Sequence, residues 1–398
     1  MKLLFATHSL ANAGGSETYL LTTALALQRL GHEVGIFTLE PGEMSELAGR
    51  SGLRVAASEE QLDSAYDAIV AQDGVTSYAL AERLPSVPQL FVAHTADYAF
   101  QYPPQLTGVV GAIVVLNDRV ARRLEGLAHC PELIRLRQPI DTRRFTPLGS
   151  LPERPASLTV LSNYLRGGRL EVARQAARDL GMSFAVAGAS EGGEPTLSPE
   201  EYLNRSDVVL GCGRSALEAM ACGRAVYVFG HVGADGWVTP ATYTALEQDG
   251  FAGLGSKGVI GADALRADLA NYEAAMGLAN QSLAVRHHDA GEHAAELVAA
   301  LRRLTPENWT RSADGSLREM SRLVRVEWQT ERRALTLEHQ LRGVDRERID
   351  WQRELERVRA EHERVLGEYE RALSGRRYRL AQALAKPLDF LRRRRRGR

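Results

Sequence analysis

One short stretch of this sequence combines a glycine turn with a cation, a hydroxyl and a carboxylate. Gly211 and Gly213 follow an apolar run, and Arg214, Ser215 and Glu218 come after the turn. Glycines let a backbone approach a phosphate closely, and backbone N–H groups beside an arginine suit a diphosphate. A carboxylate one turn further on is a good acceptor for ribose hydroxyls. We predict a nucleotide-diphosphate site here, with Ser215 capping the helix that follows the turn. The alternative is that Glu218 only complements the dipole of this helix.

Two further features lie in the amino-terminal part of the chain. Gly14 and Gly15 stand between the first apolar run and the first expected helix, where the helix amino end favours a phosphate or a sugar. A Gly-Gly pair at such a place is also common as a plain turn. His94 directly follows another apolar run, a position where a histidine is more often structural than catalytic.

The order of strands and helices decides whether these residues meet. Strands are expected at residues 3–6, 34–39, 68–71, 89–93, 111–116, 158–161, 184–187, 207–210 and 225–229, with helices between them. Short strands that are buried on both faces and separated by helices predict an α/β protein with parallel sheets. The proline-rich segment 137–157 divides it into two Rossmann-like, doubly wound domains, residues 1–150 and 151–305. A ligand cleft is expected between these domains.

Residues 1–305 resemble the retaining glycosyltransferases of family four, which have the two-domain GT-B fold. Segment 13–17 resembles the family's amino-terminal Gly-Gly-x-Glu, and segment 91–95 resembles its strand ending in a histidine. Segment 137–145 resembles the inter-domain Asn-Gly-Val-Asp-x-x-x-Phe. The most specific match is 218–223, which follows Glu-Ala-Met-Ala-x-Gly closely.

The resemblance implies roles for particular residues and also has two departures. It implies that Glu218 holds the donor ribose and that His94 contacts the transferred sugar. The first carboxylate of the family's Glu-x7-Glu pattern falls on Leu210, which cannot accept a hydrogen bond from a sugar hydroxyl. The family's diphosphate-binding Arg and Lys have no clean match. Arg166 and Arg169 are the local cations, and for each a solvated-loop role is the alternative.

Beyond residue 306 the composition changes to Arg, Glu and Leu. Apolar residues on a 4-3 spacing, from Leu337 to Ala372, predict a charged coiled coil over residues 306–375, and with it a homodimer. A lone solvated helix is the alternative, because Arg348 and His362 interrupt the seam.

The last segment, residues 376–398, holds ten Lys/Arg and one acid, a formal charge of about +9. Leu380, Leu384, Leu388 and Leu391 share one helical face there. An apolar face followed by a polybasic run suits an anionic membrane surface, at about 1 kcal/mol per cation near it. Nucleic-acid binding and a solvated tail are the alternatives; we expect no nucleic acid.

Cysteine and histidine usage predicts neither a metal site nor a cofactor. Cys130, Cys212 and Cys222 lack metal-ligand spacing and are expected to be reduced thiols. The pair 287–288 and His293 lie in a helical stretch without a pattern of partner carboxylates. With no apolar run near the roughly 20 residues of a membrane span, a cytoplasmic protein is expected, held at the inner membrane face by its tail.

Together these features favour a glycosyltransferase that uses a nucleotide-diphosphate sugar and retains the anomeric configuration, as the resemblance implies. Its expected acceptor is an envelope or lipid-linked glycan, because of the basic tail. A non-catalytic GT-B-like scaffold acting through its coiled coil is the main alternative, suggested by Leu210 and the missing Lys. A nucleotide-sugar epimerase is a weaker one, since no acid–base pair for C2 chemistry is legible.

Overall fold

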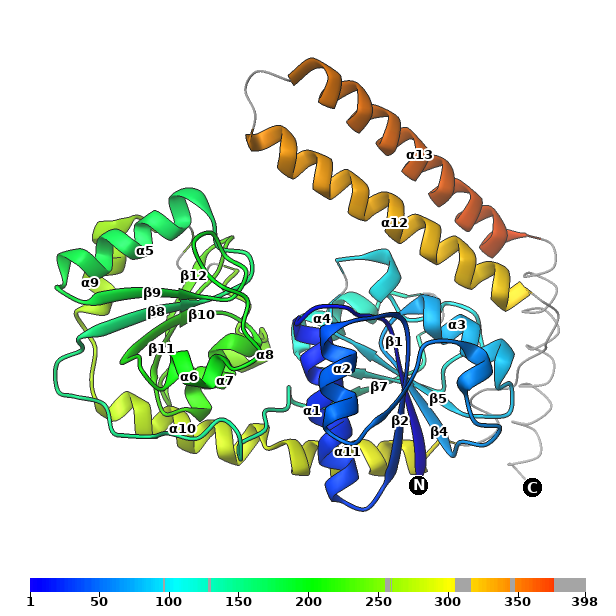
Figure 1. Ribbon diagram of the computed structural model, residues 1–398, viewed down its shortest axis with the longest axis horizontal. Helices are drawn as coiled ribbons and strands as arrows, with labels where there is room; N and C mark the ends of the chain where they lie inside the picture. Colours follow the sequence, from blue (N-terminus) through cyan, green and yellow to red (C-terminus); the bar gives the residue numbers. More distant parts are fainter. Residues whose placement is uncertain are drawn as a thin grey trace.

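The computed structural model describes residues 1–95, 97–127, 130–254, 258, 260–304, 316–343 and 348–375. Two α/β lobes lie beside each other, and a pair of long helices lies against the first lobe (Figure 1). The predicted pair of doubly wound domains is therefore confirmed. The predicted basic tail, residues 376–398, lies outside the described residues. No described helix has the length and apolar character that a membrane span requires.

The first lobe is a seven-stranded parallel sheet with the order β3-β2-β1-β4-β5-β6-β7. Its strands are β1 (Lys2–Leu10), β2 (Glu33–Pro41), β3 (Arg54–Ala56), β4 (Ala68–Ala71), β5 (Gln89–Ala93), β6 (Ala112–Val115) and β7 (Glu132–Arg135). Its connecting helices are α1 (Gly15–Arg29), α2 (Glu43–Arg50), α3 (Gly74–Arg83) and α4 (Asp118–Leu124), with 3-10 turns η1 (Glu59–Gln61) and η2 (Ala99–Gln101). The strand order reverses between β1 and β4, and ligands of such sheets bind beyond the carboxyl ends of the strands at this switch point.

The second lobe is a five-stranded sheet with the order β12-β11-β10-β8-β9, parallel except for β12. The strands are β8 (Ser157–Leu161), β9 (Ser183–Ala187), β10 (Val208–Gly211), β11 (Ala225–Phe229) and β12 (Ala234–Trp237). The helices are α5 (Gly167–Asp179), α6 (Pro199–Leu203), α7 (Arg214–Ala221), α8 (Tyr243–Gln248), α9 (Ala262–Leu269) and α10 (Ala275–His288). Here the order reverses between β8 and β10.

The chain crosses between the lobes twice, and the two crossings pair with each other. The Ile140 amide donates to the carbonyl of His288 at 2.7 Å, and the Ala290 amide donates to the Ile140 carbonyl at 3.0 Å. Asp289 is extended, so α10 ends there and α11 (Ala290–Arg302) starts in a new direction. α11 buries apolar side chains in the core of the first lobe, next to α1. Residues 290–302 thus pack with the first lobe, although the sequence division places them in the second.

The segment expected as a coiled coil forms two helices, α12 (Ser316–Gly343) and α13 (Arg348–Ser374), which run side by side in opposite directions (Figure 1). Leu337 packs against Leu355 and Val358 within the chain, and ion pairs Arg333–Glu354 and Arg359–Glu338 cross between the helices. Part of the predicted seam is therefore covered by the chain itself. A homodimer through these helices stays a prediction.

α12 docks on the first lobe through one face. Leu317, Met320, Leu323 and Val324 join the core beneath α3, and the Ser321 hydroxyl donates to the Val75 carbonyl at 2.8 Å. Glu327 follows on the same helical face and is 2% exposed. Burial, and then the charge of Glu331, raise the pKa of Glu327 to about 7.

The buried carboxyl of Glu327 should make docking of this helix pH-dependent. Its pKa is about 7 in the folded protein and near 4.5 in the unfolded chain, so stability is lost as pH rises from about 4.5 through 7. We expect Glu327→Gln to raise the free energy of unfolding by about 3 kcal/mol at pH 8, and the gain to vanish towards pH 4.5. Urea unfolding across this pH range measures it; a gain that does not depend on pH would contradict the assignment.

Candidate functional site

The glycine turn of the second lobe lies at the switch point between β8 and β10, as its predicted role requires. Gly213 has φ +56° and ψ −127°, a conformation that side-chain-bearing residues rarely adopt, and its amide donates to the Phe251 carbonyl at 2.7 Å. A β-carbon at Gly211 would lie 3.2 Å from Cβ of Ser215. The turn therefore brings the backbone tightly round into α7.

The cap of α7 differs from the sequence prediction. Gly213 occupies the N-cap position, no side chain caps the helix, and Ser215 is its second residue. The prediction that Ser215 is the cap was wrong, because the turn ends two residues earlier, at the left-handed Gly213.

Arg214 and Glu218 form a buried ion pair on α7. Nε of Arg214 donates to Oε1 of Glu218 at 2.8 Å, and each side chain is 9% exposed. Burial lowers the pKa of Arg214 and raises the pKa of Glu218, and in each case the partner's charge opposes the shift. A carboxylate accepts more than one hydrogen bond, so the pairing leaves Glu218 capacity for further donors.

Arg214 also joins the two lobes. Its Nη2 donates to Oγ1 of Thr22 on α1 at 2.9 Å, and its Nη1 donates to the Pro139 carbonyl at 2.8 Å. Glu218 therefore lies at the contact between the lobes. Leu210, by contrast, is fully buried among core side chains of the second lobe and brings no polar group to this site.

Arg166 and Arg169 have different surroundings. Arg169 donates to the carbonyls of Gly230, Gly233 and Ile260 at 2.8 to 3.4 Å and stacks over the ring of Phe229 at 4.0 Å. Arg166 is exposed, directly precedes α5, and donates one hydrogen bond to the Ala189 carbonyl at 3.3 Å. In this conformation Arg169 holds the loop that leads into β12, whereas the Arg166 guanidinium faces solvent beside the switch point.

The loop after β11 leads directly into β12. The indole N–H of Trp237 donates to the Asp268 carbonyl at 2.8 Å, and its ring meets Tyr227 edge-on. These contacts give Trp237 a structural role.

His94 lies at the carboxyl end of β5, half-buried, and faces the lobe contact. Its Nε2 is 2.6 Å from Oε1 of Gln72, and its ring meets Tyr19 edge-on at 4.9 Å. The Tyr19 hydroxyl in turn is 2.9 Å from Nε2 of His293 on α11. Desolvation, followed by the charges of Arg214 and His293, lowers the pKa of His94 to about 3. His94 is therefore a neutral imidazole that donates a hydrogen bond to Gln72.

Three histidines, His94, His288 and His293, should stay neutral over the physiological range. Burial lowers the pKa of His94 and His288 to about 3 and that of His293 to about 4. Since the unfolded chain takes up these protons near pH 6.5, stability should fall as pH drops below that value. Imidazole nitrogen NMR should show the three rings neutral down to pH 5. A midpoint near 6.5 for any of them would contradict this prediction.

Gly14 and Gly15 lie at the start of α1, at the switch point of the first lobe. A β-carbon at Gly14 would lie 2.4 Å from Oε2 of Glu17, so the Glu17 side chain folds back over this glycine. Beside this turn is a cavity of about 170 Å³, which we call the switch-point cavity. Its lining includes His8 after the apolar part of β1, Gln72 and Asp73 after β4, and Trp328 and Arg332 of α12.

Sequence reasoning missed the residues of the switch-point cavity. Polar residues directly follow the apolar cores of two strands there: Thr7, His8 and Ser9 in the first, and Gln72 and Asp73 after the second. This change from apolar to polar residues marks the carboxyl end of each strand core and could have indicated the cavity. Nothing in the local sequence of Trp328 or Arg332 placed them here.

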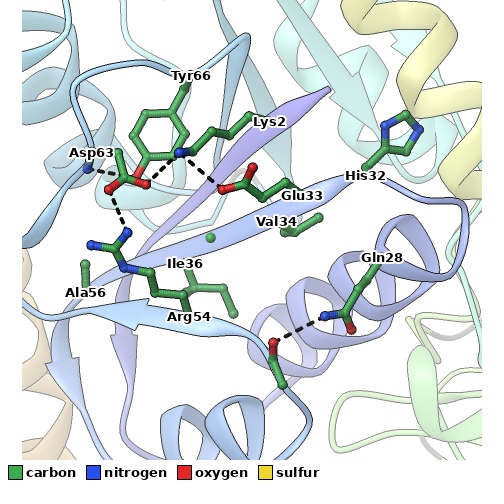
Figure 2. Close-up of a pocket in the computed structure, with 12 residues that line it drawn as sticks. Lys2, Gln28, His32, Glu33, Val34, Ile36, Arg54, Ala56, Asp63 and Tyr66 are labelled. Atoms are coloured by element: carbon green, nitrogen blue, oxygen red, sulfur yellow. Dashed lines mark hydrogen bonds and ion pairs between the residues drawn. The ribbon is translucent and has the colours of Figure 1, made fainter.

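A second cavity, of about 180 Å³, lies at the opposite end of the strands of the same sheet (Figure 2). Lys2 and Glu33 begin β1 and β2, and Figure 2 shows the Lys2 ammonium between the carboxylates of Asp63 and Glu33, at 2.8 and 3.2 Å. Asp63 also accepts from Arg54 at 2.6 Å. Because these charges satisfy one another at the amino ends of the strands, we assign this cavity a structural role.

No protein-family model matches this sequence, and no curated protein matches it. Among solved structures, Anabaena Alr3699/HepE in complex with UDP and glucose is similar, with a TM-score of 0.54, 13% identity, and coverage of 76% of this chain and 100% of its own. The same protein in complex with UDP-glucose has a TM-score of 0.52, 13% identity, and coverage of 75% and 100%. The calicheamicin glycosyltransferase CalG4 is more distant, with a TM-score of 0.47, 14% identity, and coverage of 77% and 100%. The likeness to the Anabaena structures shows the fold: this chain has the GT-B architecture of two facing Rossmann-like lobes.

Proposed function

We propose that this protein is a glycosyltransferase that moves a sugar from a nucleotide-diphosphate donor to an acceptor bound by the first lobe. The observation that carries the proposal is the position of Glu218, a buried carboxylate behind a glycine turn at the contact between two lobes. The fold is shared with a protein solved with UDP-glucose, which supports UDP-sugars as the first donors to test.

The proposed donor site uses the second lobe's switch point. The backbone around Gly211 and Gly213 and the amino end of α7 lie against the diphosphate, and Arg166 neutralises the charge that develops on it as the sugar departs. Glu218 accepts hydrogen bonds from the ribose hydroxyls. Gly14 and Gly15 leave room for the donor to approach from the first lobe.

Most of the catalysis in this proposal comes from positioning and electrostatics rather than from a base. His94, held neutral and oriented by Gln72, faces the lobe contact where the transferred sugar would lie. Retention of the anomeric configuration is implied by the family resemblance. NMR of the first product formed distinguishes retention from inversion.

The acceptor is proposed to be an envelope or lipid-linked glycan, and the basic tail is proposed to hold the enzyme at an anionic membrane surface. Vesicle co-sedimentation tests the tail: binding to anionic vesicles should be lost when residues 376–398 are removed. Binding that survives this truncation would overturn the role of the tail and leave the enzymatic proposal intact.

Calorimetric titration with UDP, GDP and ADP, followed by transfer or donor-hydrolysis assays with the matching sugars, tests the function. Binding of one nucleotide and release of its sugar is the expected result. If no nucleoside diphosphate binds, the protein is a scaffold that has kept the fold without the donor site.

A further inference from the structure

Helix α12 forms one wall of the switch-point cavity. The cavity lies beyond β1 and β4 of the first lobe, and Trp328 and Arg332, one turn apart on α12, line its other side. The Trp328 ring stacks on Phe100 at 4.0 Å, which holds this part of α12 against the loop after β5. Helix α12 therefore takes part in the region where β1, β4 and α1 converge.

Buried polar atoms in the lining have no protein partner. Both ring nitrogens of His8 and the amide nitrogen of Gln72 lack hydrogen bonds, and these residues are 3% and 2% exposed. His8 Nε2 is 3.3 Å from Oε1 of Glu40 but outside hydrogen-bond geometry. Since buried polar groups are rarely left unpaired, this concentration in one cavity is typical of a site for a polar ligand.

The charges of the lining favour an uncharged ligand. Glu17, Glu40 and Asp73 contribute three carboxyl groups, against the one guanidinium of Arg332, which is 3.8 Å from Glu40. A ligand carrying a carboxylate or phosphate would meet net repulsion here. Carboxylates, an amide and an imidazole are instead suited to hydroxyl groups, which both donate and accept.

Size and shape narrow the ligand further. The volume of about 170 Å³ has room for one sugar ring rather than an oligosaccharide. The indole of Trp328 lines the cavity beside the polar groups, and an apolar ring of this kind is suited to packing against the C–H face of a sugar. Oε1 of Gln72 accepts from His94 at 2.6 Å, so the cavity is next to the proposed transfer site.

We propose that the switch-point cavity binds one uncharged sugar ring of the acceptor and that α12, through Trp328 and Arg332, selects it. This inference rests on the proposed function only where it assigns the ring to the acceptor. Binding of the ring itself does not depend on transfer.

Fluorine NMR of the full chain labelled with fluorotryptophan tests the proposal without an activity assay. Signals are assigned by Trp328→Phe and Trp237→Phe. Methyl glucoside, methyl galactoside and methyl mannoside, at millimolar concentrations, are the neutral probes, and methyl glucuronide is their anionic counterpart. A neutral glycoside should shift the Trp328 signal and leave Trp237 of the second lobe unchanged. No shift with any neutral glycoside, or an equal shift with glucuronide, overturns the proposal.

Two variants locate the binding. Glu40→Gln changes no residue of α12 and should weaken glycoside binding about tenfold, since it removes a charged acceptor. Arg332→Ala removes a hydrogen-bond donor from the lining and should also weaken binding of the neutral glycoside, whereas Arg322→Ala, on the same helix but outside the cavity, should leave it unchanged. Unchanged glycoside binding in Glu40→Gln overturns the assignment to this cavity.

Titration of UDP into the same labelled samples separates the two proposals. Nucleotide binding without glycoside binding contradicts the ring site alone. Glycoside binding without binding of any nucleotide contradicts the glycosyltransferase assignment and leaves the ring site standing.

Discussion

Replacing Glu218 with glutamine is expected to lower kcat/KM for a nucleotide sugar about 100-fold and to destabilise the protein by about 3 kcal/mol. The first effect follows from losing a charged acceptor for the ribose hydroxyls, which is worth roughly 1.5–3 kcal/mol. The second follows because Arg214, 9% exposed, keeps its charge but loses its carboxylate partner. Breaking one side of a buried ion pair typically costs about 3–5 kcal/mol.

A double variant separates these two effects. Glu218→Gln with Arg214→Gln leaves no unpaired buried charge, so the free energy of unfolding should recover most of the loss. Donor affinity, measured by calorimetry, should stay low. Glu201→Gln, an exposed position in the same lobe, is the matched control and should change neither quantity. If donor affinity returns together with stability, Glu218 acts only by holding Arg214, and the ribose contact is wrong.

Replacing Arg166 with alanine is expected to lower kcat about 100-fold with little change in stability. Arg166 is exposed and makes one hydrogen bond, so its removal leaves no buried group unpaired. Its proposed task is to stabilise the charge on the departing diphosphate, and removing one such group commonly costs a factor of about 10² to 10³.

Arg169→Ala is the comparison for this experiment, because the two arginines are three residues apart and differ in their contacts. Arg169 holds three carbonyls and stacks on Phe229, so its loss should destabilise the second lobe by about 2 kcal/mol or more. Single-turnover rates and urea unfolding of both variants measure the split. A slow but stable Arg169→Ala beside an active Arg166→Ala would reverse the two assignments.

The fold could be predicted from the sequence where the strands are apolar throughout. β4, β5 and β11 were predicted with their observed bounds, because strands of a parallel sheet are buried on both faces and carry an uninterrupted apolar signal. β3, β7 and β12 were missed. These strands are short, lie at the edges of their sheets and include polar or glycine residues, so their pairing comes from a neighbour rather than from their own composition.

The candidate donor site could be predicted from the sequence for a related reason. Gly211, Gly213, Arg214 and Glu218 lie within one strand–turn–helix unit, and local chemistry at fixed spacing determines their arrangement. The hydrogen bond between Arg214 and Thr22 could not be predicted, because it joins residues 192 positions apart.

The sequence by itself determined two doubly wound lobes, the glycine turn with its carboxylate, and the apolar stripe of the C-terminal helices. Only the tertiary structure decided what that stripe covers. A 4-3 spacing states that one face of a helix is apolar, but a second chain, another helix or a lobe satisfies it equally. Here part of the apolar stripe packs against α13, and the preceding part of α12 packs on the first lobe. This packing brings Trp328 to the same cavity as His8 and Gln72, which are more than 250 residues away along the chain.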